Sequence, residues 1–305
     1  MDSLFKKKLI SRINEGSPLK IFFLGLAKNT GKTTALNYVY AMLRQYTQRT
    51  IVLISTGYDG EDVDAITGLP KPRIKVFTQT IFVTTENLLN LIDPSCFVEL
   101  KKFPWSTPFG KVMIAQALVD FEIPLVSPGS LKEIEQVLGV ITNMFPTSIV
   151  LVDGSINRRA FVRLSISSDI LVLSTGAAFS TQHEIQLQHM KFYHQVFTLP
   201  MIEKNLEGSF LEIVDDQNVL AFADQTIIIP DSSSVFLTPE GYMQFIKNQN
   251  KLCVQKLNAP IGLVTVNSFN PFGSPMDFST LLPELHKIFD QTPVIDIFKL
   301  ADAEA

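Results

Sequence analysis

Residues 25–34 read Gly25-Leu26-Ala27-Lys28-Asn29-Thr30-Gly31-Lys32-Thr33-Thr34, and the fold prediction starts from this stretch. The apolar run before it, Lys20–Leu24, predicts a buried strand. The residues after it have the 3.6-residue period of a helix. One buried stripe of this helix would consist of Ala35, Val39, Met42 and Tyr46. A glycine-containing loop between a strand and a helix offers backbone N–H groups and the positive end of the helix dipole, so the stretch predicts a phosphate site.

The residue types in this loop fit the phosphates and metal of a nucleoside triphosphate. Gly31 lets the backbone approach a phosphate closely, Lys32 supplies a charge for the β- and γ-phosphates, and the Thr33 hydroxyl can ligate Mg²⁺. The usual motif has about four residues between its glycines, whereas Gly25 and Gly31 enclose five. A lysine at a helix start without a ligand is the alternative. The expected nucleotide contacts in the loop are Lys28, Asn29, Thr30, Gly31, Lys32, Thr33 and Thr34.

Short apolar runs alternate with segments of helical period along the chain, which predicts a doubly wound, mostly parallel α/β sheet of the P-loop NTPase type. We expect further helices after Ser130, where Glu133 completes a capping box, after Thr238-Pro239, and over 278–289. We expect one domain over 1–305, in which 18–178 carry the nucleotide motifs and 179–305 complete the sheet and the adenine-side turn. The further strands expected are 51–55, 74–77, 81–84, 148–152, 170–173, 226–229, 261–266 and 294–298.

Acidic residues follow two of these strands. Asp153 ends the strand 148–152, so its carboxylate would project beside the loop and serve Mg²⁺, although it could instead cap a turn. Asp59 and Glu61 follow the strand 51–55, the usual place for groups that sense the γ-phosphate or position the attacking water. We therefore assign catalytic roles to Lys32, Asp59 and Glu61, and metal roles to Thr33, Asp59 and Asp153. A solvated acidic turn is the alternative for Asp59 and Glu61.

Composition and charge limit the classes of ligand and partner that we expect. The 26 basic and 30 acidic residues give a net charge of −4, which argues against nucleic acid as a ligand. The cluster Lys6-Lys7-Lys8 lies on an amphipathic stretch that either touches a membrane or, as we expect, caps the core. Its apolar residues are Leu4, Phe5, Leu9, Ile10 and Ile13. No early apolar run is long enough for stable membrane insertion. With two cysteines and no secretion signal recognised, the expected location is cytoplasmic.

The five-residue spacing of the loop resembles that of dethiobiotin synthetase and related ATP-using P-loop enzymes. The segment Asn267-Ser268-Phe269-Asn270-Pro271, which follows the strand 261–266, is similar to their Asn-x-x-Asn-Pro turn. That resemblance implies that Asn267 reads the adenine ring, so that ATP is favoured over GTP. An ordinary polar turn after a strand is the alternative for Asn267.

A more specific resemblance covers about residues 25–176. The segments 26–34, 59–61 (Asp-Gly-Glu), 67–74 (Thr-Gly-Leu-Pro-Lys-Pro-Arg-Ile) and 152–158 (Val-Asp-Gly-Ser-Ile-Asn-Arg) stand in the order found in the ATPase component of the lysine 5,6-aminomutase reactivating factor. One departure is Asn157, where we expect an acidic residue. Arg158 and Arg159 could contact phosphate or a partner, or form surface ion pairs.

The resemblance implies a chaperone with slow, partner-stimulated ATPase activity, ATP and Mg²⁺ as ligands, and two partners. These are a second reactivase subunit and an adenosylcobalamin-dependent aminomutase, from which damaged cobalamin is exchanged. The alternative is an ATP-dependent, carboxylate-activating ligase of the dethiobiotin synthetase type. A third interpretation, a GTP-dependent metallochaperone, is disfavoured because no Cys/His metal cluster stands out in the sequence.

Overall fold

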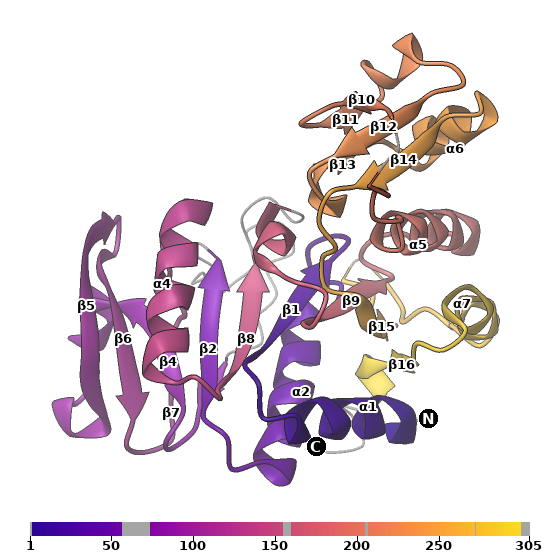
Figure 1. The fold of residues 1–305 in the computed structure, drawn as a ribbon. Coiled ribbons are helices and arrows are strands. Elements are labelled where there is room, and N and C mark those ends of the chain that lie inside the picture. Colours follow the sequence, from indigo (N-terminus) through magenta and orange to yellow (C-terminus); the bar gives the residue numbers. More distant parts are fainter. Residues whose placement is uncertain (1, 57–73, 155–159, 205–206, 272, 300–305) are drawn as a thin grey trace.

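The computed structural model describes residues 2–56, 74–154, 160–204, 207–271 and 273–299. It confirms an α/β fold built on a large, mostly parallel sheet of nine strands, in the order β16-β15-β9-β1-β8-β2-β4-β6-β5 (Figure 1). The strands from β16 to β4 are parallel to their neighbours, and β6 and β5 complete the sheet as an antiparallel hairpin. The bounds are β1 Leu19–Gly25, β2 Ile51–Thr56, β4 Ile81–Thr85, β5 Phe97–Thr107, β6 Gly110–Ala117, β8 Ile149–Gly154, β9 Ile170–Gly176, β15 Ile261–Asn267 and β16 Val294–Asp296.

Helices cover both faces of this sheet. Alternate residues of β1 show why: Ile21 and Phe23 belong to one buried cluster, and Phe22 and Leu24 belong to another. The first cluster is covered by α1 and α2, and the second by α4, α5 and α7, which is the arrangement of a doubly wound sheet. The helices are α1 Asp2–Asn14, α2 Lys32–Tyr46, α3 Glu86–Leu89, α4 Leu131–Met144, α5 His183–Phe197, α6 Pro239–Lys247 and α7 Leu281–Phe289.

Several local predictions are confirmed. The Ser130 hydroxyl accepts a hydrogen bond from the Glu133 N–H at the start of α4, and Thr238 caps α6 with proline at its first turn. Helix α7 begins at Leu281, three residues later than expected. The placement of Tyr46 on the buried stripe of α2 is wrong, because Tyr46 ends the helix and the residue is 41% exposed.

The amphipathic stretch at the N-terminus forms α1, and the prediction that it caps the core is confirmed for one face of the helix. Phe5, Leu9 and Ile13 are buried in the cluster shared with α2, whereas Leu4 is exposed. Lys8 donates a hydrogen bond to the carbonyl of Gln291 at 2.6 Å. Within the described part of the chain, no helix is long and apolar enough to cross a membrane.

The described residues of 199–258 form a small unit, whose hydrophobic cluster also includes Phe192 and Val196 of α5 and which stands beyond α5 in Figure 1. The prediction that 226–229 belongs to the main sheet is wrong, because this strand pairs instead with two strands close to it in sequence. The single-domain prediction for 1–305 stays a prediction.

The remaining strands are short. In the small unit they are β10 Ser209–Phe210, β11 Val214–Asp215, β12 Thr226–Ile229, β13 Val235–Phe236 and β14 Lys251–Val254. Elsewhere β3 Lys75–Val76 pairs with β7 Phe121–Glu122. The 3₁₀ helices are η1 Pro94–Cys96, η2 Ala160–Leu164, η3 Val219–Ala221 and η4 Ser232–Ser234.

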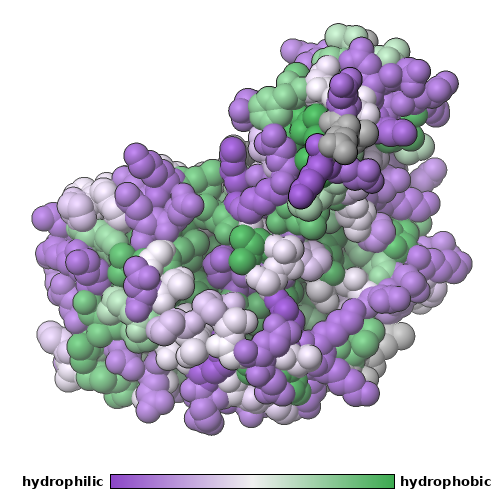
Figure 2. Space-filling model, viewed as in Figure 1, coloured by the Kyte–Doolittle hydropathy of each residue, from purple (hydrophilic) through white to green (hydrophobic). Residues whose placement is uncertain are grey.

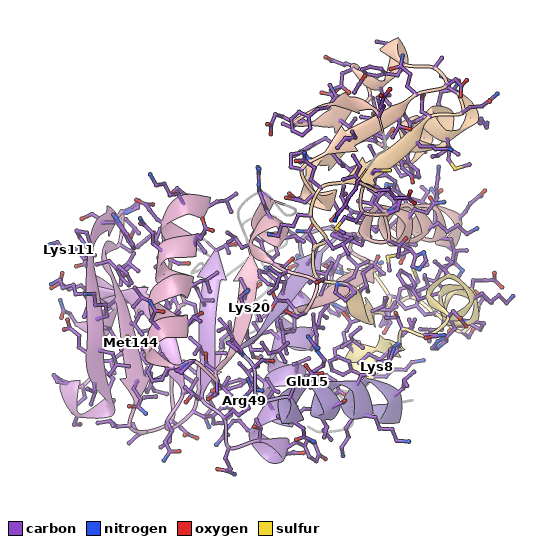
Figure 3. The ribbon with its side chains drawn as sticks, in the orientation of Figure 1. Lys8, Glu15, Lys20, Arg49, Lys111 and Met144 are labelled. Carbon is purple, nitrogen blue, oxygen red and sulfur yellow. The ribbon has the colours of Figure 1, made fainter. Side chains whose placement is uncertain are left out.

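Arg49 lies at the edge where the parallel strands begin (Figure 3). Its guanidinium donates to the carbonyls of Thr147 at 2.6 Å and Ile13 at 2.8 Å, and also to those of Ser17 and Ser148. Because Arg49 itself precedes β2, its side chain connects the start of β2 to the end of α1 and to the starts of β1 and β8. The opposite edge, where these strands end, is left for the candidate site.

Candidate nucleotide site

The loop of residues 25–32 lies at the carboxyl edge of the sheet. It joins the end of β1 to the start of α2, and β1 lies directly beside β8, with Phe23 opposite Asp153. Strand β2 lies on the other side of β8, with Ser55 opposite Asp153. The ends of three parallel strands therefore meet around the start of α2, which is where open α/β sheets bind ligands.

The loop is held in a compact shape by its own residues and by β9. The Leu26 N–H donates to the Ser174 carbonyl at 2.9 Å, and the Thr30 hydroxyl donates to the Ala27 carbonyl at 3.0 Å. A Cβ atom on Gly25 would lie 2.7 Å from the Thr30 hydroxyl oxygen, so this position has room for glycine alone. Gly31 precedes α2 with a φ of 83°, a left-handed conformation that glycine adopts without strain.

Asp153 lies beside the loop, where the sequence predicted its carboxylate, and it forms an ion pair with Lys32 that was not predicted. Lys32 Nζ lies 2.5 Å from Asp153 Oδ1 and donates to the Gly154 carbonyl at 2.5 Å. The Asp153 side chain is 5% exposed and the Lys32 side chain 17%, so the pair is largely removed from water. Asp153 also accepts a hydrogen bond from the Gly154 N–H at 2.8 Å. The ammonium group is therefore held at the mouth of the loop, with its charge balanced by one carboxylate.

Asn267 joins the loop from the far side of β9. Its side-chain Nδ2 donates to the Asn29 carbonyl at 3.2 Å, and its Oδ1 accepts from the Phe269 N–H at 3.1 Å. A Cβ on Gly31 would lie 3.0 Å from the Asn267 Cβ, and one on Gly176 would lie 2.3 Å from its carbonyl oxygen. Asn267 thus packs against the loop and tethers it, while its predicted contact with adenine stays a prediction.

The other predicted loop residues differ in exposure. The side chain of Lys28 is exposed, Asn29 is half-buried, and Thr30 is 1% exposed. Thr33 and Thr34 are half-buried in the first turn of α2. The predicted catalytic residues Asp59 and Glu61 lie outside the described residues, as do 155–159 with Asn157, Arg158 and Arg159.

Two hydroxyl groups that the sequence analysis did not single out lie at the ends of neighbouring strands. Ser55 near the end of β2 and Thr85 at the end of β4 are buried, and neither hydroxyl has a hydrogen-bond partner among the described residues. The sequence feature that could have indicated them is the change from apolar residues to Ser-Thr at the end of β2 and to Thr-Thr at the end of β4. A buried hydroxyl without a partner carries a desolvation cost that a polar ligand atom would remove.

Comparison with known proteins finds no match to a family model, to a curated protein or to a solved structure. Within the described ranges, no group of three or more His, Cys, Asp and Glu side chains is arranged to hold a metal ion. Function is therefore inferred from the geometry of the loop and of its neighbours.

Proposed function

We propose that this chain is a P-loop protein that binds ATP and Mg²⁺ at residues 25–34. The observation that carries the proposal is the pair formed by Lys32 and Asp153 at the start of α2, at 2.5 Å. A triphosphate brought to the N–H groups at this helix start would compete with Asp153 for the ammonium of Lys32. Asp153 would then be released to serve the cation, with the Thr33 hydroxyl as its second ligand.

Bound Mg²⁺ would neutralise charge on the phosphates, and the protein would add positioning and electrostatic stabilisation. Lys32 holds the charge that develops on the β- and γ-phosphates. Asp59 and Glu61 follow β2, which ends beside Asp153. We assign to these two carboxylates the sensing of the γ-phosphate and the orientation of the attacking water. With these residues alone we expect slow ATP hydrolysis. Hydrolysis would become faster when a partner protein completes the site.

The same proposal makes the chain the ATP-hydrolysing subunit of a cytoplasmic reactivating chaperone that exchanges damaged cobalamin on an adenosylcobalamin-dependent aminomutase, together with a second reactivase subunit. The motif set between residues 26 and 158 supports this role. We assign the contact with the partner to the small unit of residues 199–258, which carries exposed apolar side chains. Among them are Phe210, Ile213, Phe236 and Met243, each 43–49% exposed. In Figure 2 they belong to a unit whose visible surface mixes hydrophilic and hydrophobic side chains.

The small unit is also bonded to the segment that follows β8, and this supports communication between nucleotide and partner. Asn258 Nδ2 donates to the Val162 carbonyl at 3.0 Å, and Asn258 Oδ1 accepts from the Ser232 hydroxyl at 2.6 Å. The Ala259 N–H donates to the Ser165 hydroxyl at 2.9 Å. Because η2 follows Asp153 closely in the chain, a shift of β8 on nucleotide binding would reach the small unit through these bonds.

The alternative function is an ATP-dependent, carboxylate-activating ligase. The observation that favours it is the presence of two buried hydroxyls, Ser55 and Thr85, that have no hydrogen-bond partner among the described residues. These lie at the ends of β2 and β4, on the side of β8 away from β1. A small acid bound there would find hydrogen-bonding groups beside the γ-phosphate.

A titration of the purified chain with ATP and Mg²⁺ tests nucleotide binding. We expect Lys32→Ala to weaken binding at least about 100-fold, since charge-assisted bonds to phosphate are lost. Lys191→Ala is the matched control, because Lys191 is an exposed lysine on α5, and it should bind ATP like the unchanged chain. Equal affinity in the two variants would refute the P-loop assignment.

Capture from the native cell extract, with magnesium and a non-hydrolysable ATP analogue, tests the chaperone role. Retention of an adenosylcobalamin enzyme by the tagged chain, and its loss with Lys32→Ala, is the expected result. If ATP binds but no cobalamin enzyme is retained, the ligase is favoured instead. Turnover of ATP with a small carboxylic acid then becomes the decisive assay.

A further inference from the structure

A cavity of 390 Å³ lies between the tip of the β5–β6 hairpin and the start of α4. Its walls are mostly apolar, and it is of the size that holds a small organic ligand. Strand β6 runs antiparallel to β4, so the hairpin tip lies at the same edge of the sheet as residues 25–32. Figure 3 shows Lys111 near this tip and Met144, the last residue of α4, farther down the sheet. The residues that line the cavity include Trp105, Pro108, Phe109, Val126, Ser127 and Glu133.

The aromatic wall of the cavity is formed by Trp105, whose ring packs on a core residue. The ring of Trp105 stacks on that of Phe103, with centroids 4.6 Å apart and an angle of 13° between the planes. Phe103 is 5% exposed and belongs to the core cluster under α4, whereas Trp105 is half-buried. Phe103 thus holds the Trp105 indole from the core side. A planar ring bound in the cavity would stack on an indole that is already oriented.

Two polar groups define what such a ring must carry. Ser127 lines the cavity and is 2% exposed, and its hydroxyl has no hydrogen-bond partner among the described residues. Glu133 is the one charged residue among the described residues that line the cavity. Its carboxylate Oε2 accepts a hydrogen bond from the Ser130 hydroxyl at 2.7 Å, and among the described residues Oε1 has no donor, so it is open to a ligand N–H. Glu133 stands in the first turn of α4, so its charge opposes the attraction of an anion to the helix N-terminus.

We propose that this cavity is a binding site for a small planar aromatic molecule that carries an amine, with the ring against Trp105 and the amine between Ser127 and Glu133. The stacked indole supplies the surface for the ring, and it also attracts a cation. Ser127 and Glu133 are both acceptors for the N–H groups of an ammonium. An aromatic carboxylate of the same size would face the Glu133 charge and should bind more weakly. This site does not depend on nucleotide binding at residues 25–34.

Intrinsic tryptophan fluorescence can monitor binding in this cavity, because Trp105 is the single tryptophan of the chain. The test is a titration of the full chain with phenethylamine and, separately, with phenylpropionate, followed by tryptophan emission and by calorimetry. We expect a saturable change with phenethylamine, with a Kd on the order of 1 mM, and binding of phenylpropionate at least about tenfold weaker. No saturable binding of the amine, or equal binding of amine and acid, would overturn the proposal.

Variants identify the polar groups. Glu133→Gln keeps an acceptor for Ser130 but removes the charge, so it should weaken phenethylamine about tenfold and narrow the preference for the amine over the acid. Ser127→Ala should weaken both compounds. The control is Glu99→Gln, which removes an exposed carboxylate on β5 outside the cavity and should leave both affinities unchanged. An unchanged preference in Glu133→Gln, with emission and unfolding like the parent chain, would also contradict the assignment.

Discussion

The side chain of Asn267 donates a hydrogen bond to the carbonyl of Asn29 at 3.2 Å, although 238 residues separate the two in the chain. The bond joins the end of β15 to the loop that precedes α2. Both polar atoms of the Asn267 amide are engaged with backbone, because Oδ1 accepts from Phe269. This geometry favours a role for Asn267 in holding the shape of the loop, whichever base the nucleotide carries.

Asn267→Ala therefore should weaken ATP and GTP by the same factor. We expect about a fivefold to tenfold loss for each, since one hydrogen bond that orders the loop is worth about 1 kcal/mol. Competition of both nucleotides against a fluorescent ATP analogue measures the two affinities side by side. A loss confined to ATP would show instead that Asn267 reads the adenine ring.

Gly31→Ala should destabilise the fold. The φ of 83° costs a residue with a Cβ about 1–2 kcal/mol, and the new atom would lie 3.0 Å from the Cβ of Asn267. Gly139→Ala is the matched control, because Gly139 lies inside α4 with nothing within 4 Å of an added Cβ. That variant should be more stable by about 0.5–1 kcal/mol. Urea unfolding gives the free energy of unfolding of both variants. Equal values would contradict the left-handed conformation of Gly31.

Arg49→Ala should lower the free energy of unfolding by about 2 kcal/mol, because the hydrogen bonds from the guanidinium to four backbone carbonyls are lost. Arg49→Lys should recover less than half of this loss, since an ammonium cannot reproduce the planar fork of a guanidinium. Thermal unfolding gives the stabilities. ATP affinity should stay unchanged in both variants, because Arg49 lies at the edge opposite the loop; a large loss of affinity would show that the two edges are coupled.

His194 makes stability depend on pH. Burial lowers the pKa of His194 below its ordinary value of 6.5, and its ring stands edge-on to Phe289 at 5.2 Å. The unfolded chain therefore binds a proton more readily than the folded chain does. Stability is highest above this ordinary value, and it falls as the pH drops through 6.5 toward the lower folded pKa. In His194→Gln, urea unfolding at several pH values should show a shallower fall in this window; an identical fall would assign it to other groups.

Elements with local signals could be predicted from the amino-acid sequence. The strand before Gly25, the helix after Gly31, the cap at Ser130 and the strand that ends at Asp153 all follow from hydrophobic period and capping chemistry, which depend on residues within a few positions. The edge strand β5 gave no such signal. Its run Phe97–Thr107 carries Lys101, Lys102 and a proline on the exposed parts of an edge, where a regular apolar alternation is not required.

Which of these elements are neighbours follows only from the folded chain. Residue period cannot say that β8 lies between β1 and β2, that 226–229 joins a separate small sheet, or that Asn267 reaches Asn29. The cavity beside Trp105 likewise exists because a hairpin and a helix start, which lie apart in the chain, meet at one edge. Local propensity acts over a turn or a strand, whereas the site is made by burial and pairing between segments brought together when the sheet forms.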